Sequence, residues 1–526
     1  MAQHAGRLRI AAALALAGSL LLGGCAASST SDETADAGDV VDIALPGSLS
    51  SLYPGQEAGI LNYYVASIAQ EGLVSVGADG SIQPGLAESW EQPDASTYVY
   101  RLRDDARFQD GSPVTADDVV FSIERALDAE ASPSFAGWLS NIDTYAATGE
   151  DEITITLKEP DTGFSWLPST AGALFVTSRA WTEEQEAAGG GDGLILGSGP
   201  YRVTEFVPDS YVDFERVDTW WNGVPEVERL HITFVPDEST RLLAWQGGDL
   251  DLAFNVPLTQ AAQWEKVEGA DVRYVPDLSY VGLAFDTSLP PFDDPHVRRA
   301  IGHSLDRDAV VDTILRGHGE AATAVITPES LGSVWSADES RERLGDIPQL
   351  GFDLDAARAE LAQSSVPGGF QAELLFPATG PQLGDAAQTL AQNLAEIGID
   401  LTVTEVPIEQ WFGTLGDGEH GIGFTWYFST TGDPAELVSF LLGDGNSANY
   451  ANADAQALLA QARGETDPTA RAELLVAANA AAAPDAAYVP LWWGQSATAF
   501  GNGLTIADDS PFTFVGPWAA SLSRAE

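Results

Sequence analysis

Lysine and cysteine are nearly absent from this chain. Lys158 and Lys266 are its only lysines, and Cys25 is its single cysteine. A disulfide cannot form within a chain that has one thiol. The six histidines have no metal-ligand spacing; apart from His4, near the amino terminus, they are His231, His296, His303, His318 and His420. We therefore predict no metal site.

Positive charge is also scarce. The 526 residues include 24 Lys plus Arg against 78 Asp plus Glu, a net charge of -54. Such a surface repels phosphate groups, which makes nucleic acid and anionic lipid headgroups poor partners for the folded part; we predict no nucleic-acid partner. Because 44% of the residues are hydrophobic and the chain is too long for one compact core, we expect at least two lobes.

Motifs of enzymes are missing as well. The sequence has no GxSxG, HExxH, CxxC or GxxxxGK[ST], so it offers no sign of a nucleophile elbow, a zinc site or a phosphate loop. Pairs of carboxylates could serve a glycosidase, but 78 acidic residues make such pairs uninformative. A secreted hydrolase stays the alternative of a second class; we predict no catalytic residue and no cofactor.

One apolar run near the amino terminus is too short to span a bilayer comfortably. It covers Ile10–Leu22, follows Arg7 and Arg9, and leads into Leu-Gly-Gly-Cys, which ends at Cys25. This pattern resembles a bacterial lipoprotein signal, in which the cysteine becomes the lipid-bearing first residue. We expect a signal peptide over residues 1–24 and a flexible, lipid-anchored tether over 25–39. An ordinary cleaved secretory leader is the alternative.

The stretch from Glu71 to Leu127 contains a strand, a turn and an amphipathic helix. Tyr98 to Leu102 alternates apolar and polar residues, Asp110-Gly111 supplies a turn, and Thr115 with Asp118 is typical of a helix amino terminus. Four apolar residues recur along one face of the helix that follows: Val119, Val120, Ile123 and Leu127.

Other segments show either the alternation typical of a strand or the apolar face typical of a helix. Strands are expected from Val40, over 153–157, around 232–234, over 399–403 and over 488–493. Helices are expected after Asp293 or Asp294, with Pro295 in the first turn, and over 355–361, 386–397 and 469–483. Gly197, Gly199 and Pro200 predict a turn into a strand at Tyr201. Strands that alternate with helices favour an α/β fold.

Several stretches carry a resemblance to a known family, among them EGLVSVGADGSIQPGLAESW from Glu71 with the strand and helix up to Leu127, GSGPYRVTEFVPDS from Gly197, DTWWNGVPEVERLHITF from Asp218 and PPFDDPHVRRAIG from Pro290. The chain resembles the family 5 extracytoplasmic solute-binding proteins of ABC importers. The resemblance implies an α/β, two-lobed periplasmic-binding-protein-like fold with mixed sheets and an extra subdomain in the first lobe. The expected first lobe covers 40–285, with the extra subdomain at about 54–190, the second covers 286–485, and 486–526 returns to the first lobe.

The resemblance also implies a function. A receptor of this kind is a monomer that captures an extracellular solute between its lobes and presents it to ABC permease subunits with cytoplasmic ATPases. We expect it on the extracytoplasmic face of the membrane, held by its lipid. An oligopeptide is the expected ligand; an oligosaccharide, an opine or a metal chelate is the alternative.

Ligand contacts are expected in the stretch FTWYFSTTGDPAEL from Phe424. Peptide receptors of the family have an Asp here that pairs with the ligand's α-amino group, but the matching slot holds Ser429 or Thr430. Asp433 is the nearest carboxylate, and capping the helix that Pro434 begins is its alternative role. Of three consecutive aromatic residues, at least one should face solvent or the cleft. The candidate ligand-binding residues are Asn62, Tyr63, Tyr280, Trp426, Tyr427, Phe428, Ser429, Thr430 and Asp433.

Overall fold

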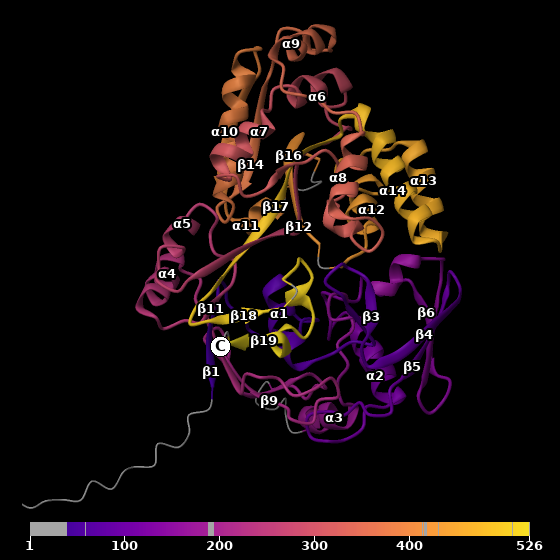
Figure 1. The fold of residues 1–526 in the computed structure, drawn as a ribbon. Coiled ribbons are helices and arrows are strands. Elements are labelled where there is room, and N and C mark those ends of the chain that lie inside the picture. Colours follow the sequence, from indigo (N-terminus) through magenta and orange to yellow (C-terminus); the bar gives the residue numbers. More distant parts are fainter. Residues whose placement is uncertain are drawn as a thin grey trace, which may run out of the picture. The chain divides into compact units, whose positions relative to one another are not determined.

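The computed structural model describes residues 39–57, 59–187, 194–412, 414, 418–429, 431–507 and 509–524 (Figure 1). The predicted signal peptide, Cys25 and Thr430 lie outside the described residues. The elements up to residue 285 are β1 Val40–Leu45, α1 Ile60–Ala69, β2 Val74–Val76, β3 Ile82–Pro84, β4 Ala87–Asp94, β5 Thr97–Leu102, α2 Ala116–Leu127, β6 Ile142–Ala147, β7 Glu152–Leu157, the 3-10 helix Thr162–Trp166, α3 Arg179–Ala187, β8 Tyr201–Val207, β9 Tyr211–Arg216, β10 Arg229–Phe234, α4 Glu238–Gly247, β11 Leu252–Ala253, α5 Ala261–Trp264 and β12 Asp271–Phe285.

The second half of the chain is richer in helices. It contains α6 Pro295–Gly302, α7 Arg307–Ala309, a π-helical turn Val310–Ile314, β13 Glu320–Ala321, the 3-10 helix Pro328–Leu331, α8 Ala337–Gly345, α9 Leu354–Gln363, β14 Gln371–Pro377, α10 Pro381–Ala395, β15 Asp400–Val406, α11 Ile408–Phe412, β16 Ile422–Phe428, α12 Ala435–Leu442, α13 Ala453–Gly464, α14 Pro468–Ala482, the 3-10 helix Ala483–Asp485, β17 Tyr488–Phe500, β18 Leu504–Ile506, the 3-10 helices Thr513–Val515 and Trp518–Ser521, and β19 Leu522–Arg524.

A mixed nine-stranded sheet runs through both halves. Its order is β16-β12-β17-β11-β1-β10-β9-β8, and β13 also pairs with β17. The long strands β12 and β17 pair antiparallel from Asp271 opposite Phe500 to Ala284 opposite Tyr488, with a register shift between Pro276 and Tyr280. These two strands therefore connect the first-lobe elements to the second-lobe elements (Figure 1).

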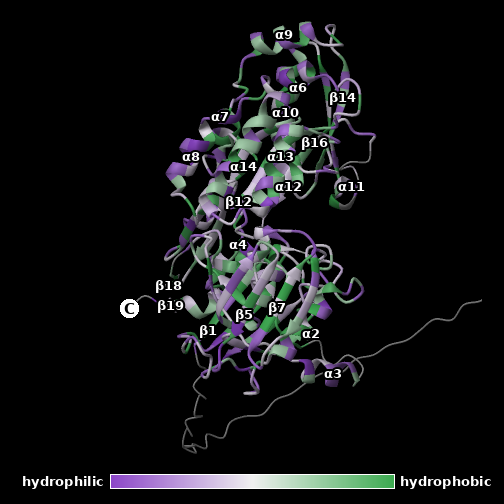
Figure 2. Ribbon diagram, turned by 90° about the vertical axis from the view of Figure 1, so that its right-hand side faces the viewer, coloured by the Kyte–Doolittle hydropathy of each residue, from purple (hydrophilic) through white to green (hydrophobic). Residues whose placement is uncertain are grey.

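The predicted strand, turn and helix form part of the first lobe. β5 and β7 lie side by side in a second sheet of order β4-β5-β7-β6, and hydrophobic and hydrophilic residues lie next to one another in it (Figure 2). Thr115 and Asp118 form the predicted capping box of α2, and Val119 and Ile123 are buried. Gly111 adopts a left-handed φ of 88°, which its turn requires.

Glu71, the first residue of the stretch that ends at Leu127, is buried in the first lobe. Its carboxylate accepts hydrogen bonds from the indole nitrogens of Trp220 and Trp221 at 3.3 and 3.0 Å, and the Arg103 guanidinium lies 3.4 Å from the Trp221 ring centroid. Burial raises the pKa of Glu71 to about 7, although the donated hydrogen bonds and Arg103 act in the opposite direction. Glu71 is thus a structural part of the first-lobe core.

Two second-lobe helices, α6 and α10, show how capping residues and proline determine where a helix begins. Asp294 caps α6, with Pro295 in its first turn, as predicted. The helix predicted over 386–397 begins earlier, at Pro381, because proline is favoured in a first helical turn. It ends at Ala395, shortly before Gly398, whose φ of 92° turns the chain toward β15. The strand predicted over 488–493 continues to Phe500, where it pairs with the start of β12.

The buried apolar residues form separate clusters in the two lobes. One large cluster is built from β1, α1, α2, β7, β8 to β10 and the carboxyl-terminal segment, whereas two clusters draw mainly on residues beyond 280. The predicted two-lobed α/β fold with mixed sheets is confirmed. The residue boundaries of the lobes stay a prediction.

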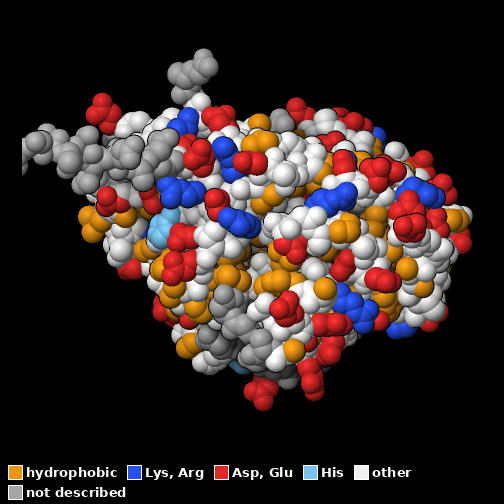
Figure 3. Space-filling view, turned by 90° about the horizontal axis from the view of Figure 1, so that it is seen from below, with side chains coloured by type: hydrophobic (Ala, Val, Ile, Leu, Met, Phe, Trp, Pro, Cys, Tyr) orange, Lys and Arg blue, Asp and Glu red, His pale blue; other side chains and the backbone are white. Residues whose placement is uncertain are grey.

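The surface carries the charge that the composition predicts. On the face in Figure 3, Asp and Glu side chains are spread widely and Lys or Arg side chains lie among them. No helix formed by the described residues has the length and apolar composition to cross a membrane.

Candidate functional site

The end of β16 brings the first group of candidate residues together. β16 pairs with β12 so that Tyr427 lies opposite Tyr280 and Trp426 opposite Val281. Neighbouring side chains on a strand point to opposite faces, so Trp426 and Phe428 share one face and Tyr427 takes the other. Phe428 is 36% exposed, which agrees with the expectation that one of the three aromatics faces outward.

Glu436, in the first turn of α12, is surrounded by hydroxyl groups from this segment. Tyr427 and Ser429 donate hydrogen bonds to its two carboxylate oxygens, both at 2.6 Å, and the Thr431 hydroxyl donates another. Burial raises the pKa of Glu436, and these hydrogen bonds partly counter that effect. Glu436 therefore fixes the chain between β16 and α12.

Asp433 is engaged by a guanidinium. Arg471 of α14 donates from Nη1 to Oδ1 at 2.7 Å and from Nη2 to Oδ2 at 3.1 Å, and the two side chains are 7% and 14% exposed. The backbone N–H of Ala435 also donates to Oδ1 at 3.0 Å. Asp433 thus makes the expected contact at the helix start, although α12 begins at Ala435, one residue after Pro434. Whether Asp433 also contacts a ligand stays a prediction.

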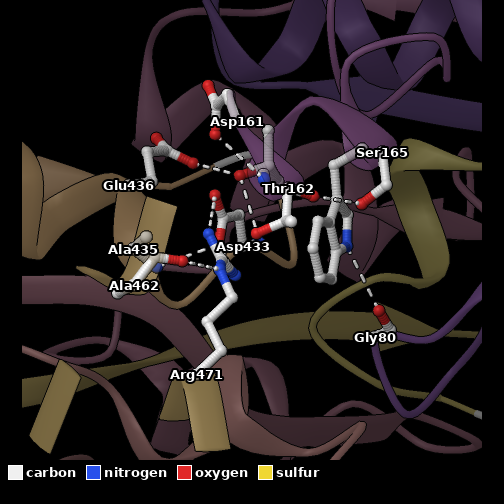
Figure 4. Close-up of polar contacts among 12 residues, drawn as sticks. Gly80, Asp161, Thr162, Ser165, Asp433, Ala435, Glu436, Ala462 and Arg471 are labelled. Atoms are coloured by element: carbon white, nitrogen blue, oxygen red, sulfur yellow. Dashed lines mark hydrogen bonds and ion pairs between the residues drawn. The ribbon is translucent and has the colours of Figure 1, made fainter. Parts of the chain in front are cut away.

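Asp161 of the first lobe lies against this ion pair (Figure 4). Its Oδ1 accepts a hydrogen bond from the N–H of Gly163 at 3.0 Å. A Cβ on Gly163 would lie 2.2 Å from Asp433 Oδ2, so the two lobes approach closely and the position needs glycine. Burial and then the charge of Asp433 raise the pKa of Asp161, while Arg471 and Arg463 oppose them.

A cavity of about 500 Å³ opens beside these groups, and residues of both lobes line it. We call it the interlobe cavity. Trp138 of the first lobe and Phe440 of α12 are 37% and 49% exposed at its edge. The other residues that line it include Asn141, Glu159, Asp161, Gly163, Leu167, Tyr427, Thr431, Asp433, Glu436, Ser439, Arg463 and Arg471. Its volume lies within the range of ligand sites, about 300–1,000 Å³.

Four of the candidate residues lie in packed surroundings instead. Tyr63 is 6% exposed and packs edge-on against Phe135 and Phe175, and the Asn62 side chain donates to the Glu57 carbonyl. Tyr280 is fully buried. Trp426 is half-buried and packs against the second-lobe cluster. Of the described candidates, only Tyr427 and Asp433 line the interlobe cavity.

Sequence reasoning did not identify several residues of this site: Trp138, Asp161, Glu436, Phe440 and Arg471. The signal for Glu436 was present, since three hydroxyl residues precede an acid in the first turn of the next helix. Asp161 and Arg471 carried no such signal, because they meet Asp433 only through the folded arrangement of distant segments. Within the described residues, no group of three or more His, Cys, Asp and Glu side chains is arranged to hold a metal.

Comparison with known proteins agrees with this architecture. Residues 81–449 match the family described as bacterial extracellular solute-binding proteins, family 5. The chain belongs to this family. Its members act outside the cytoplasm and deliver their ligands to ABC permeases.

Relatives cover most of the chain. The glutathione-binding protein GsiB of Escherichia coli is 26% identical over 493 residues, which is 90% of this chain and 93% of that protein. The heme-binding protein A of Haemophilus influenzae is 26% identical over 442 residues, 78% of each chain. The solved structure of the binding protein DppA from Helicobacter pylori in complex with peptide STSA superimposes with a TM-score of 0.76 at 23% identity, covering 93% of this chain and 98% of that one.

Proposed function

We propose that this protein is a lipid-anchored receptor that captures an extracellular oligopeptide between its lobes and passes it, unchanged, to a membrane permease. The interlobe cavity is the observation that carries the proposal, because both lobes contribute charged and aromatic side chains to one site. The peptide-bound DppA structure and the glutathione-binding relative support the choice of ligand class. Cys25, the single thiol, would carry the lipid.

Ligand capture of this kind works by a shift of population. A solute that contacts both lobes favours the arrangement in which the lobes meet, by as much as its affinity for the two arrangements differs. Asp161 and Asp433 come from different lobes and line the same cavity. A ligand bound there would contact both lobes and favour their closure.

Two measurements on the purified, ligand-stripped protein test the proposal. Calorimetry with unmodified di- to pentapeptides should give saturable, stoichiometric binding, and mass spectrometry should recover the peptides intact. Phe440→Ala should weaken binding because it removes an aromatic edge of the cavity, whereas Phe352→Ala should not. Phe352 is a suitable control because it is 46% exposed and does not line the cavity.

The results separate the alternatives. No saturable binding of any peptide, together with a different compound retained by the protein as purified, would replace oligopeptide with that ligand class. Conversion of bound peptide to fragments would instead indicate a hydrolase. Unchanged acyl labelling in Cys25→Ala would show that the lipid is not on that cysteine.

A further inference from the structure

A second, smaller pocket lies beside Phe428, and one of its walls is a carboxylate that accepts no hydrogen bond from the described part of the chain. Asp509 follows β18, and each of its carboxylate oxygens is buried and accepts no hydrogen bond from any described residue. We call this the Asp509 pocket. Its volume is about 20 Å³, and its polar lining consists of Tyr64, Asn255, Ser496, Thr498, Asp509 and Ser510.

The charge of Asp509 is only partly offset by Arg273, whose donors are bonded to other groups. The guanidinium of Arg273 donates to Asp271 at 2.8 Å, to the Thr505 hydroxyl at 2.8 Å and to the Ile506 carbonyl at 3.3 Å. Burial raises the pKa of Asp509, and Arg273 only partly counters this effect. A buried carboxylate that accepts no hydrogen bond and whose charge is only partly compensated is costly, so the pocket favours a cationic occupant.

The size and lining of the pocket restrict that occupant. About one water-sized group fits into 20 Å³. Besides the carboxylate, the Thr498 hydroxyl, the Asn255 amide and the Tyr64 hydroxyl can accept hydrogen bonds. A primary ammonium group has this size and donates three hydrogen bonds, and the Phe428 ring adds a surface that attracts cations. Guanidinium and quaternary ammonium groups are too large.

The pocket, like the interlobe cavity, is lined by residues of both lobes. Asp509 and most of the lining belong to the first lobe, but Phe428 ends β16 of the second lobe and is 36% exposed. The slot in which peptide receptors of the family place an acid holds Ser429, and this hydroxyl is already bonded to Glu436. The carboxylate of Asp433 is bound to Arg471.

From this geometry we infer that Asp509 binds a primary ammonium group of the transported solute and thereby selects solutes that carry one. The inference rests on the proposed receptor function and deepens it by naming the chemical class. The ammonium can come from an amino terminus or from a lysine side chain, which present the same chemistry to the pocket.

Methylammonium chloride probes the pocket without any peptide. At equal ionic strength, it should raise the melting temperature of the ligand-free protein above that in sodium chloride or tetramethylammonium chloride. Asp509→Asn should abolish this difference, and Asp385→Asn should keep it. Asp385 is an exposed acid of α10 and serves as the control. Circular dichroism checks that each variant is folded, and Asp509→Ser is a second variant for the same comparison.

Peptides provide the second arm. N-acetylation of the di- to pentapeptides should weaken binding about 100-fold or more, as expected for loss of one partner of a buried charge pair, and Asp509→Asn should weaken unmodified peptides similarly. Acetylated peptides that contain lysine distinguish the two sources: retained affinity assigns the side-chain ammonium. If no peptide binds, the proposed ligand class fails, and the methylammonium arm decides the present inference alone.

Two results would overturn the inference. Equal stabilisation by sodium or potassium would make this an inorganic cation site. Peptide binding that is indifferent to both acetylation and Asp509→Asn, with no methylammonium effect, would mean that water fills the pocket, while the receptor function stands.

Discussion

The interlobe cavity and the Asp509 pocket both place carboxylates beside the end of β16, but they satisfy them differently. Asp433 has a bidentate guanidinium and a backbone N–H, and Glu436 has three hydroxyl donors. Asp509 has no hydrogen-bond donor among the described residues. Buried polar groups are nearly always satisfied in folded proteins. The contrast therefore separates carboxylates that hold the fold together from one that is left available to a ligand.

Of the changes proposed here, breaking the ion pair between Arg471 and Asp433 should lower the free energy of unfolding most. Arg471→Met leaves Asp433 buried beside Asp161 without its cation, so we expect the free energy of unfolding to fall by about 3–5 kcal/mol. Urea titration measures the loss. The double variant Arg471→Met with Asp433→Asn should recover part of it, because the uncompensated charge is then gone. A loss below about 1 kcal/mol in the single variant would contradict the structural role of the pair.

Removing the acceptor of the hydroxyl cluster should have an intermediate effect. Glu436→Ala leaves the Tyr427, Ser429 and Thr431 hydroxyls without their shared acceptor, and we expect a loss of about 1–3 kcal/mol. Thermal unfolding monitored by circular dichroism measures it. Tyr427→Phe removes one donor and should cost less; an equal cost would mean that the ring packing, rather than the cluster, determines stability.

Replacing the carboxylate of Asp509 should raise the free energy of unfolding, whereas the two changes above lower it. Asp509→Asn removes a buried charge to which no described residue donates a hydrogen bond, so the ligand-free protein should gain about 1 kcal/mol at pH 7. The sign follows from linkage: burial raises the folded-state pKa of Asp509 above its ordinary value of 3.8. Its contribution to stability is therefore present below pH 3.8 and is lost as the pH rises through the folded-state pKa.

Unfolding experiments at two pH values check this prediction. The difference between Asp509→Asn and wild type should be clear at pH 7 and should vanish near pH 3. A variant that is less stable than wild type at neutral pH would show that Asp509 has a stabilising partner and belongs with Asp433 and Glu436.

An exposed ion pair should have the smallest effect and provides the baseline. Arg101 lies 3.1 Å from Glu152, and its side chain is 50% exposed. Arg101→Ala should change the free energy of unfolding by no more than about 0.5 kcal/mol, because solvent screens such pairs. The same urea titration measures it, and a change as large as that of Arg471→Met would remove the distinction between buried and exposed charges.

Local features of this fold were predictable from sequence. The capping box at Thr115 and the cap at Asp294 depend on residues two to three positions apart, and both are present. The candidate site was harder to predict from the sequence. Asp509 reaches its pocket from a segment after β18, and the other lining residues include members of α1, β12, β16 and β17, so no spacing in the sequence indicates the pocket. Among 78 acidic residues, only burial and the lack of a donor distinguish this one.

The pairing of β12 with β17 has a consequence for how the protein unfolds. Val281, Leu283, Val489 and Leu491 of these strands belong to a second-lobe cluster, whereas Phe500 and Ala499 belong to first-lobe clusters. Melting of either lobe would remove packing from strands that the other lobe also needs. The two lobes should therefore lose their structure together, in one cooperative calorimetric transition, rather than as two independent domains.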